Sequence, residues 1–364
     1  MENTGKNQPG KWFAEALLRW NTEQNNRQMP WKGEKDPYKI WLSEIILQQT
    51  RVEQGLSYYN NFIKTFPDIH RLAKAQDATV FKLWEGLGYY SRCRNLIATA
   101  RFISKDLKGK FPDTYDSIRS LKGIGPYTAS AISSFAYNLP HAVVDGNVFR
   151  VLARIFGVDK AIDSTEGKKY FTGLADQLLD RKQPGLYNQA IMDFGAVICK
   201  PSPVCQQCVF RKKCFAFINN KIGELPVKGK KISIKKRWFY YIVIEYKNRI
   251  AIRQRVAKDI WQDLYEFPLI EPLKETDQKN IVQAAEKEGW LMKKEYEFDA
   301  ASPLFKQQLS HQLIAGQFIR IRVSRKPVND RNWVWVTKSD IAKYAFPKFI
   351  TQYLGSKTLE QTLF

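Results

Sequence analysis

No stretch of this sequence comes near the run of about 18 apolar residues that a membrane-spanning helix needs, and residues 1–11 are polar and lack the apolar centre of a secretory signal. Internal repeats and low-complexity segments are absent as well. Cysteine is scarce, with 5 residues in 364, and most of them lie together between Cys199 and Cys214. That crowding is typical of a metal centre in a reducing compartment rather than of disulfide bonds. We therefore expect a cytoplasmic protein without a membrane partner.

Acidic residues are also in short supply. Asp and Glu together number 36 against 58 Lys and Arg, which gives a formal net charge of +22. Such an excess favours a polyanionic partner, because a basic surface gains binding free energy when it releases counterions from nucleic acid. A merely basic protein with no such partner is the alternative. The length suits two domains, each able to bury a core.

The spacing of apolar residues divides the chain into three parts. From residue 10 to 225 the spacing is mostly helical, beginning with a stripe that includes Trp12, Phe13 and Trp20. Residues 226–237 are rich in lysine and predict a basic linker. Residues 238–355 mix strand and helix patterns, with a hairpin predicted at Lys247-Asn248. We therefore predict an all-α domain followed by an α+β domain. Further helices are predicted near 38–52, 55–65, 77–84, 91–107, 126–138, 147–156, 166–180 and 185–199 in the first domain and near 277–288 in the second, with strands near 293–298, 315–323 and 332–336.

Glu44 occupies an apolar segment. If residues 38–52 form a helix, Glu44 shares a face with Trp41 and Leu47. Burial disfavours the charged carboxylate, so we expect its pKa to rise toward the value that a general acid needs near neutral pH. An isolated glutamate more often reaches solvent or forms an ion pair, here with Arg51, and that alternative stays open.

Asp145 carries the opposite expectation. It precedes a helix predicted to begin near Asn147, so its carboxylate can accept backbone N–H bonds and be held ionised by the helix dipole. An ordinary N-cap role is the alternative. A neutral carboxyl group at Glu44 and a charged one at Asp145 would divide the work as in glycosidic bond cleavage through oxocarbenium-like transition states.

Gly123 and Gly125 flank a single apolar residue, and Pro126 then begins a run of small residues typical of a helix. A tight glycine turn before a helix N-terminus presents unpaired backbone N–H groups at close range. We predict that this turn binds a backbone phosphate.

Cys199, Cys205, Cys208 and Cys214 are separated by five, two and five residues. Zinc bound by four thiolates is one interpretation. Zinc ribbons usually present two close pairs, whereas this sequence has one, so a [4Fe–4S] cluster suits the spacing better, although the common ferredoxin spacings differ from it too.

Taken together, these segments resemble the helix-hairpin-helix superfamily of DNA glycosylases, and within it the MutY family of adenine glycosylases. The resemblance is strong from about residue 10 to 220 and looser beyond. The motifs that carry it are Trp-Leu-Ser-Glu-Ile-Ile-Leu-Gln-Gln-Thr (41–50), Gly-Leu-Gly-Tyr-Tyr-Ser-Arg (86–92), Leu-Lys-Gly-Ile-Gly-Pro-Tyr-Thr-Ala (121–129), Val-Asp-Gly-Asn-Val (144–148) and the four cysteines.

The resemblance implies a monomeric enzyme with a [4Fe–4S] cluster, acting on duplex DNA that contains adenine opposite 8-oxoguanine or guanine. Glu44 then matches the general acid and Asp145 the carboxylate that stabilises or traps the sugar cation. Tyr127 and Asn147 match polar groups of the active site, while Gln49 and Tyr89 match residues that wedge into the duplex. Without the resemblance, Tyr127 and Tyr89 are as easily explained as packing residues.

Relatives that also cut the DNA strand carry a lysine where this chain has Tyr127, so the resemblance implies a monofunctional glycosylase. Two alternatives remain: an endonuclease III-like glycosylase with lyase activity, and a non-catalytic iron–sulfur protein that binds DNA. The intact pair of Glu44 and Asp145 counts against the second.

The second domain resembles the MutT-like (nudix) domain of the same family, most clearly in residues 260–268, Ile-Trp-Gln-Asp-Leu-Tyr-Glu-Phe-Pro. It lacks the glutamate-rich box that would hold Mg²⁺ over a diphosphate, so we expect recognition rather than hydrolysis. Leu309, Ser310 and His311 match the family's Phe-Ser-His loop that reads 8-oxoguanine, with an ordinary turn as the alternative. Three departures from the family are Leu309 for Phe, a first cysteine gap one residue short, and Lys32 for Arg in Met29-Pro-Trp-Lys32.

Overall fold

A computed structural model describes residues 10–50, 52–229, 233–330 and 332–356. Contacts divide the chain into two compact units, one made of the described residues of 1–74 and 95–231 and the other of those of 75–94 and 232–364. Each is described below by itself. No helix in the described ranges is both long and apolar enough to cross a bilayer.

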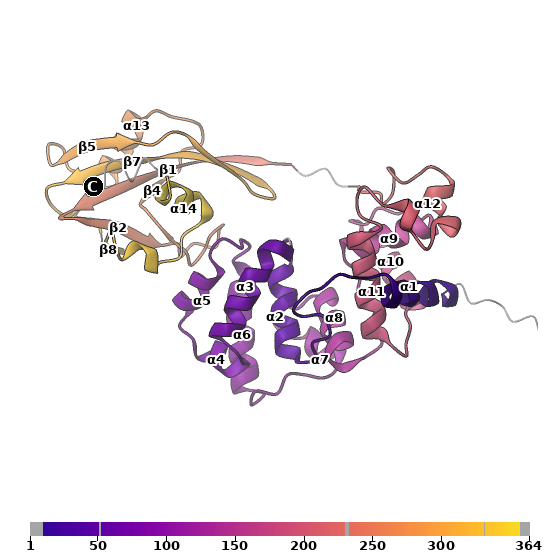
Figure 1. The fold of residues 1–364 in the computed structure, drawn as a ribbon. Helices are drawn as coiled ribbons and strands as arrows, with labels where there is room; N and C mark the ends of the chain where they lie inside the picture. Colours follow the sequence, from indigo (N-terminus) through magenta and orange to yellow (C-terminus); the bar gives the residue numbers. More distant parts are fainter. Residues whose placement is uncertain (1–9, 51, 230–232, 331, 357–364) are drawn as a thin grey trace, which may run out of the picture. The chain divides into compact units, whose positions relative to one another are not determined.

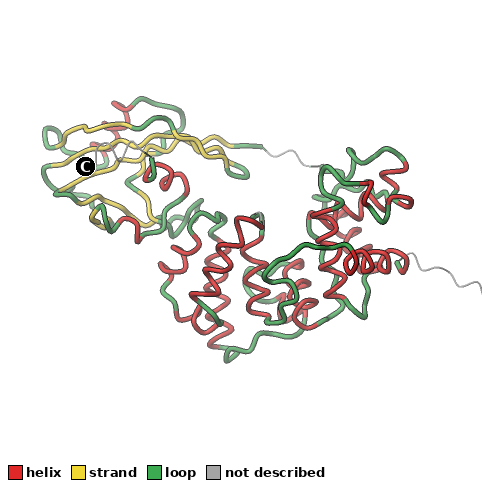
Figure 2. The backbone as a smooth tube through the Cα atoms, in the orientation of Figure 1, coloured by secondary structure: helices red, strands yellow, loops and turns green. Residues whose placement is uncertain are grey.

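The first unit is helical (Figures 1 and 2). Its helices are α1 (Lys11–Glu23), α2 (Pro37–Leu47), α3 (Val52–Thr65), α4 (Ile69–Lys74), α6 (Ser91–Lys105, whose first turn groups with the second unit), α7 (Tyr115–Arg119), α8 (Pro126–Tyr137), α9 (Gly146–Phe156), α10 (Thr165–Leu178), α11 (Pro184–Val197) and α12 (Phe215–Ile218), with short 3-10 turns η1 (Cys205–Gln207) and η2 (Arg211–Lys213).

Helix α11 is central to the core of this unit. It contacts α1, α8 and α9. Its Phe194 is fully buried and meets Trp20 of α1 edge to face, with ring centroids 4.9 Å apart. Burying large aromatic side chains in this way supplies much of the stabilisation of a helical core. Helices α8 and α9, which position Tyr127, Asp145 and Asn147, are therefore packed against this central helix.

The glycine turn joins α7 to α8. Gly123 has φ +81°, a left-handed conformation that favours glycine, and a Cβ there would lie 2.6 Å from Cβ of Asn95. Gly125 is the N-cap of α8, and Pro126 takes the first helical position. Helix α7, the glycine turn and α8 together correspond to the helix-hairpin-helix that the resemblance implied.

The second unit contains a mixed sheet of β1 (Lys235–Tyr246), β2 (Arg249–Gln254), β3 (Tyr265–Glu266), β4 (Leu269–Ile270), β5 (Tyr296–Ala301), β6 (Phe305–Gln308), β7 (Gln312–Val323) and β8 (Trp333–Thr337). The main path is β3-β2-β1-β7-β5, and β1 pairs with β7 in parallel from Lys235 opposite Gln312 to Glu245 opposite Arg322. The helical elements of this unit are α5 (Asp77–Trp84), α13 (Gln278–Lys287), η3 (Ile341–Lys343) and α14 (Lys348–Leu354).

Helices α13 and α14 cover opposite faces of this sheet. Ile242 of β1 packs in a cluster with Ile281 of α13. Tyr241, the next residue, points the other way and meets Phe349 of α14, with centroids 6.2 Å apart. The alternation of side chains along a strand therefore builds two cores, one on each face.

The predicted fold classes are confirmed, a helical domain and a domain with a mixed sheet. The predicted helix over 38–52 is wrong in one respect, because it ends at Leu47 and Gln49 adopts φ +57°. The hairpin at Lys247-Asn248 is confirmed, and both residues have positive φ. The pattern missed the short helices α4, α7, α12 and α14 and the strands β3, β4 and β6. The predicted boundaries 10–225, 226–237 and 238–355 stay a prediction, and residues 230–232 of that linker lie outside the described ranges.

Candidate active site

Glu44 lies on the buried face of α2, with 7% of its surface exposed. The pKa of Glu44 is raised to about 7, mainly by burial; a hydrogen bond from Tyr127 opposes the rise and the negative charge of Asp145 adds to it. The predicted rise is confirmed. The alternative of a solvent-exposed glutamate is wrong, and Arg51, the suggested partner in an ion pair, lies outside the described residues.

Tyr127 is near the start of α8, directly after the glycine turn. Burial and the neighbouring carboxyl groups hold the pKa of Tyr127 well above its usual value, so its hydroxyl stays protonated and donates to Glu44. Tyr127 therefore does more than pack behind the hairpin, because it contacts the candidate acid directly.

Asp145 is the N-cap of α9, as predicted. Its Oδ1 accepts from the backbone N–H groups of Asn147 and Val148, both at 2.8 Å, and its Oδ2 accepts from Nδ2 of Asn147 at 2.9 Å. One expectation is wrong: the pKa of Asp145 is raised, because burial outweighs the lowering by these hydrogen bonds and by Arg150. Three hydrogen-bond donors nevertheless stabilise the ionised form of Asp145, whereas Glu44 accepts from Tyr127. Glu44 is therefore the carboxyl group more readily protonated.

Asn147 is held by Arg150, which the sequence reading did not identify. Nη2 of Arg150 donates to Oδ1 of Asn147 and to the carbonyl of Gly195, both at 2.8 Å, while its Nε donates to the carbonyl of Cys199 at 2.7 Å. A Cβ on Gly195 would lie 2.7 Å from Cβ of Asn147. Hydrogen bonds thus connect Asp145 through Asn147 and Arg150 to the backbone of the first clustered cysteine. The sequence does contain one indication of this contact, because Arg150 lies one helical turn after Asn147.

The four clustered cysteines line one small cavity of about 20 Å³, together with Arg154 and apolar side chains. Burial raises the pKa of Cys208 to about 12, so its thiol is neutral unless a metal binds. Arg154, 5% exposed, points Nη1 at Sγ of Cys199 from 3.8 Å. A buried cation beside the sulfurs suits a centre of net negative charge.

Zinc and iron–sulfur centres both take thiolate ligands, so four cysteines around one cavity fit either kind of metal centre. Within the described ranges, no group of three or more His, Cys, Asp or Glu side chains is arranged to hold a single metal ion.

The residues predicted to contact DNA lie at the surface. Gln49 is exposed just beyond α2, while its neighbour Gln48 donates from Nε2 to Oγ1 of Thr128 at 3.2 Å. A Cβ on Gly125 would meet no heavy atom of the described chain within 4 Å beyond its immediate neighbours. The turn is therefore open to a ligand on that side.

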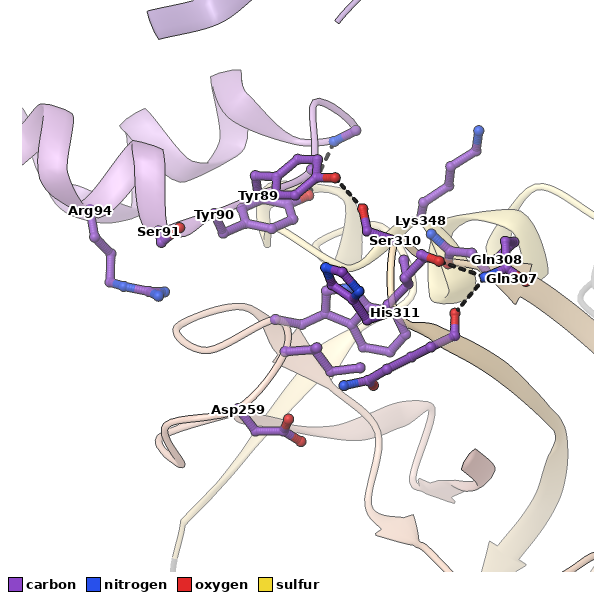
Figure 3. A pocket seen from close by; sticks show the side chains of 16 residues that line it. Tyr89, Tyr90, Ser91, Arg94, Asp259, Gln307, Gln308, Ser310, His311 and Lys348 are labelled. Carbon is purple, nitrogen blue, oxygen red and sulfur yellow. Dashed lines mark hydrogen bonds between the residues drawn. The ribbon is translucent and has the colours of Figure 1, made fainter. Parts of the chain in front are cut away.

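The predicted lesion-recognition residues lie in the second unit, around a cavity of about 520 Å³ (Figure 3). Leu309, Ser310 and His311 form the three-residue connection between β6 and β7. Tyr89, 47% exposed and with φ +47°, shares a short hydrogen bond with Oγ of Ser310, so it is not a core aromatic residue. Gln308, which the sequence reading missed, donates from Nε2 to the carbonyls of Leu309 and Gln312 across the turn.

Asp193 of α11 anchors the segment that contains Lys32. The carboxylate is fully buried and pairs with Nη1 of Arg27 at 2.8 Å and with Nζ of Lys32 at 3.3 Å, while Nδ2 of Asn25 donates to it at 2.9 Å. Nothing in the sequence pattern indicated this pairing across the chain. It gives Lys32 a defined place in the loop before α2.

Comparisons with known proteins match both parts of the chain. Residues 42–175 match the HhH-GPD superfamily of base excision DNA repair proteins, and residues 239–356 match the NUDIX domain. Adenine DNA glycosylase of Buchnera aphidicola subsp. Baizongia pistaciae is 32% identical over 94% of this chain and 95% of its own length. The human adenine DNA glycosylase is 40% identical over 56% of this chain and 39% of its own.

Solved structures match the first part of the chain. A thermostable thymine-DNA glycosylase is 30% identical, with a TM-score of 0.53, and the match covers 57% of this chain and 96% of that one. An endonuclease III trapped on DNA as a covalent intermediate has a TM-score of 0.50 at 16% identity over 57% of this chain and 95% of its own, which shows a common fold.

Proposed function

Because the chain belongs to the adenine DNA glycosylase family, whose members remove adenine from DNA in base-excision repair, we propose that its substrate is adenine opposite 8-oxoguanine or guanine and that it hydrolyses the N-glycosidic bond without cutting the strand. The observation that carries the proposal is the buried Glu44, whose pKa of about 7 reflects burial and the charge of Asp145. An acid of that pKa is half protonated at neutral pH, as proton transfer to a departing base requires.

The roles of the site residues follow from their contacts. Adenine must leave the base stack before any protein group can reach its glycosidic bond. Glu44 then donates its proton to a ring nitrogen of adenine, the C–N bond breaks with its electron pair leaving on the base, and positive charge develops on the sugar. The Asp145 carboxylate, fixed by Asn147, stabilises or traps that cation, and Glu44, now ionised, accepts a proton from the attacking water. Tyr127 orients Glu44 by donating a hydrogen bond to it.

Strand cleavage is the property that separates this proposal from an endonuclease III-like enzyme with lyase activity. Tyr127 stands at the position where lyase relatives carry a lysine, and a phenol cannot form a Schiff base with the sugar. We expect release of free adenine from an A:8-oxoguanine duplex, with strand cleavage only after hot alkali. The same assay with adenine opposite guanine and opposite thymine gives the preference for the opposite base. Cleavage without alkali at the rate of base release would overturn the monofunctional assignment.

The four clustered cysteines are proposed to hold a [4Fe–4S] cluster, which would cross-link the loop from Cys199 to Cys214 through four Fe–S bonds. We expect purified protein to show a broad absorption near about 400 nm and to lose it when Cys205 is replaced by Ser. Cys93, which is buried and outside the group, provides the control: Cys93→Ser should leave the absorption intact. Zinc in place of iron would contradict the assignment.

Ser310 and His311 are proposed to read 8-oxoguanine by hydrogen bonds from the exposed turn, with Leu309 unable to stack or wedge as an aromatic ring would. Replacing both Ser310 and His311 by Ala should lower the preference for 8-oxoguanine over guanine opposite adenine by about tenfold, since a net hydrogen bond is worth about 1 kcal/mol. The measurement is the ratio of single-turnover rates on the two duplexes. Lys306→Ala, on the preceding strand and outside the cavity, is the matched control. An unchanged ratio in the double variant would reject the assignment.

A further inference from the structure

Asn188 lies on α11, away from the reacting groups, and none of its surface is exposed. Its side-chain amide makes three hydrogen bonds to two different segments of the chain. Nδ2 donates to Oγ of Ser134 on α8 at 2.9 Å and to the carbonyl of His141 at 2.8 Å, and Oδ1 accepts from the backbone N–H of Val143 at 3.2 Å. A buried amide whose N–H groups and oxygen are all hydrogen-bonded holds one orientation, because any rotation would leave a buried polar group unpaired.

The segment from His141 to Val143 leads directly into Asp145. It lies between α8 and α9 and forms neither helix nor strand, so its backbone groups have no regular ladder to hold them. Asn188 contacts the segment at both ends, once as donor and once as acceptor. It thereby fixes the path of the chain two residues before the candidate carboxylate.

Helix α11 also fixes the chain on the other side of Asp145. The carbonyl of Gly195 accepts from Arg150, which holds Asn147. One helix therefore supports the segment before Asp145 through Asn188 and the residue after it through Gly195. Ser134 adds a link from Asn188 to α8, the helix on which Tyr127 contacts Glu44.

We propose that Asn188 is a positioning residue for the glycosylase reaction, one that places Asp145 relative to Glu44 by holding the backbone at His141 and Val143. The inference rests on the proposed role of Asp145. Asn188 touches no reacting atom and acts through the chain. A displacement of about 1 Å in a reacting group can cost about 100-fold in rate, so loss of this anchor should slow base release far more than it weakens DNA binding.

The test compares Asn188→Ala with Ser134→Ala in the full-length protein. Asn188→Ala removes both contacts to the 141–143 segment, and we expect a loss of about 100-fold in the single-turnover rate of adenine release. Its affinity for the mispaired duplex, measured in a Glu44→Gln background, should stay within about threefold. Ser134→Ala removes the link from Asn188 to α8 and the bond from Ser134 to the carbonyl of Ala131, but leaves both contacts to the 141–143 segment, so it should lower the melting temperature while leaving the rate within about threefold. A normal rate in Asn188→Ala, or an equal loss in Ser134→Ala, would overturn the proposal.

A double variant separates positioning from general destabilisation. If Asn188 acts through Asp145, adding Asn188→Ala to Asp145→Asn should cost no further rate, whereas independent effects would multiply. Multiplying losses would reject the proposal.

Should Asn188→Ala fail to fold, Asn188→Asp keeps the volume and the acceptor toward Val143, and we expect a loss of about tenfold. A wild-type rate in Asn188→Asp would also reject the proposal. If instead Asp145→Asn alone keeps a wild-type rate, the proposed role of Asp145 fails first.

Discussion

Replacing Glu44 by Gln should reduce the single-turnover rate of adenine release by about 10²- to 10⁴-fold, the range for loss of a general acid. Glutamine fills the same space on α2 and can still accept the hydrogen bond from Tyr127, but it has no proton to transfer. Binding of the mispaired duplex, measured by fluorescence anisotropy, should be retained. The rate is measured with enzyme in excess, so that product release does not limit it.

The pH dependence of the wild-type enzyme provides the control for this result. In the proposed mechanism Glu44 acts in its protonated form, and its pKa is about 7, so the rate should be highest below that pH and should fall about tenfold per pH unit well above it. In Glu44→Gln this alkaline fall should disappear. Wild-type activity in Glu44→Gln would assign the proton transfer to another group, and retained binding with no activity in either protein would indicate a non-catalytic DNA-binding protein.

The second large effect is expected from Asp145→Asn. Asparagine is as good an N-cap as aspartate, so α9 should keep its first turn and the melting temperature should change little. The negative charge proposed to face the sugar cation is lost, and removal of such a transition-state contact costs about 10²- to 10³-fold in rate. Single-turnover assays on the A:8-oxoguanine duplex measure the loss.

Asp145→Asn should also shift the pH profile, which tests the contact between the two carboxyl groups. The charge of Asp145 contributes to the raised pKa of Glu44. Without that charge the pKa of Glu44 should fall, so the alkaline limb of the residual activity should move to lower pH. A limb in the same place would mean that the two groups do not interact during the reaction, and an undiminished rate would exclude Asp145 from catalysis.

Local pattern was sufficient to predict much of the fold and part of the site. The helix that carries Glu44 follows from its apolar spacing, and the N-cap geometry of Asp145 follows from its place before Asn147. The break after Leu47 did not follow, because Gln48 and Gln49 are ordinary helix formers and the left-handed turn at Gln49 has no local signature. Short elements such as β3 and β4 are too brief to show a period.

The ionisation of Asp145 shows the limit of local reasoning more clearly. The favourable N–H contacts were read correctly, since they come from adjacent residues. The cost of burying the carboxyl group arises only in the folded chain, and this cost decides the direction of the pKa shift. Asn188 and Asp193 were missed for the same reason, because their partners lie on other elements.

Gly195 has no role in the chemistry, yet its surface touches Asn147 so closely that a single added methyl group would overlap it. An alanine at position 195 would force either α11 or Asn147 to move by a few tenths of an ångström or more. Helix α11 is held by its contacts with α1, α8 and α9. Gly195→Ala is therefore expected to give an enzyme that folds and binds DNA but works slowly. A survey limited to residues that contact the substrate would not include Gly195 and would miss the effect of a substitution there.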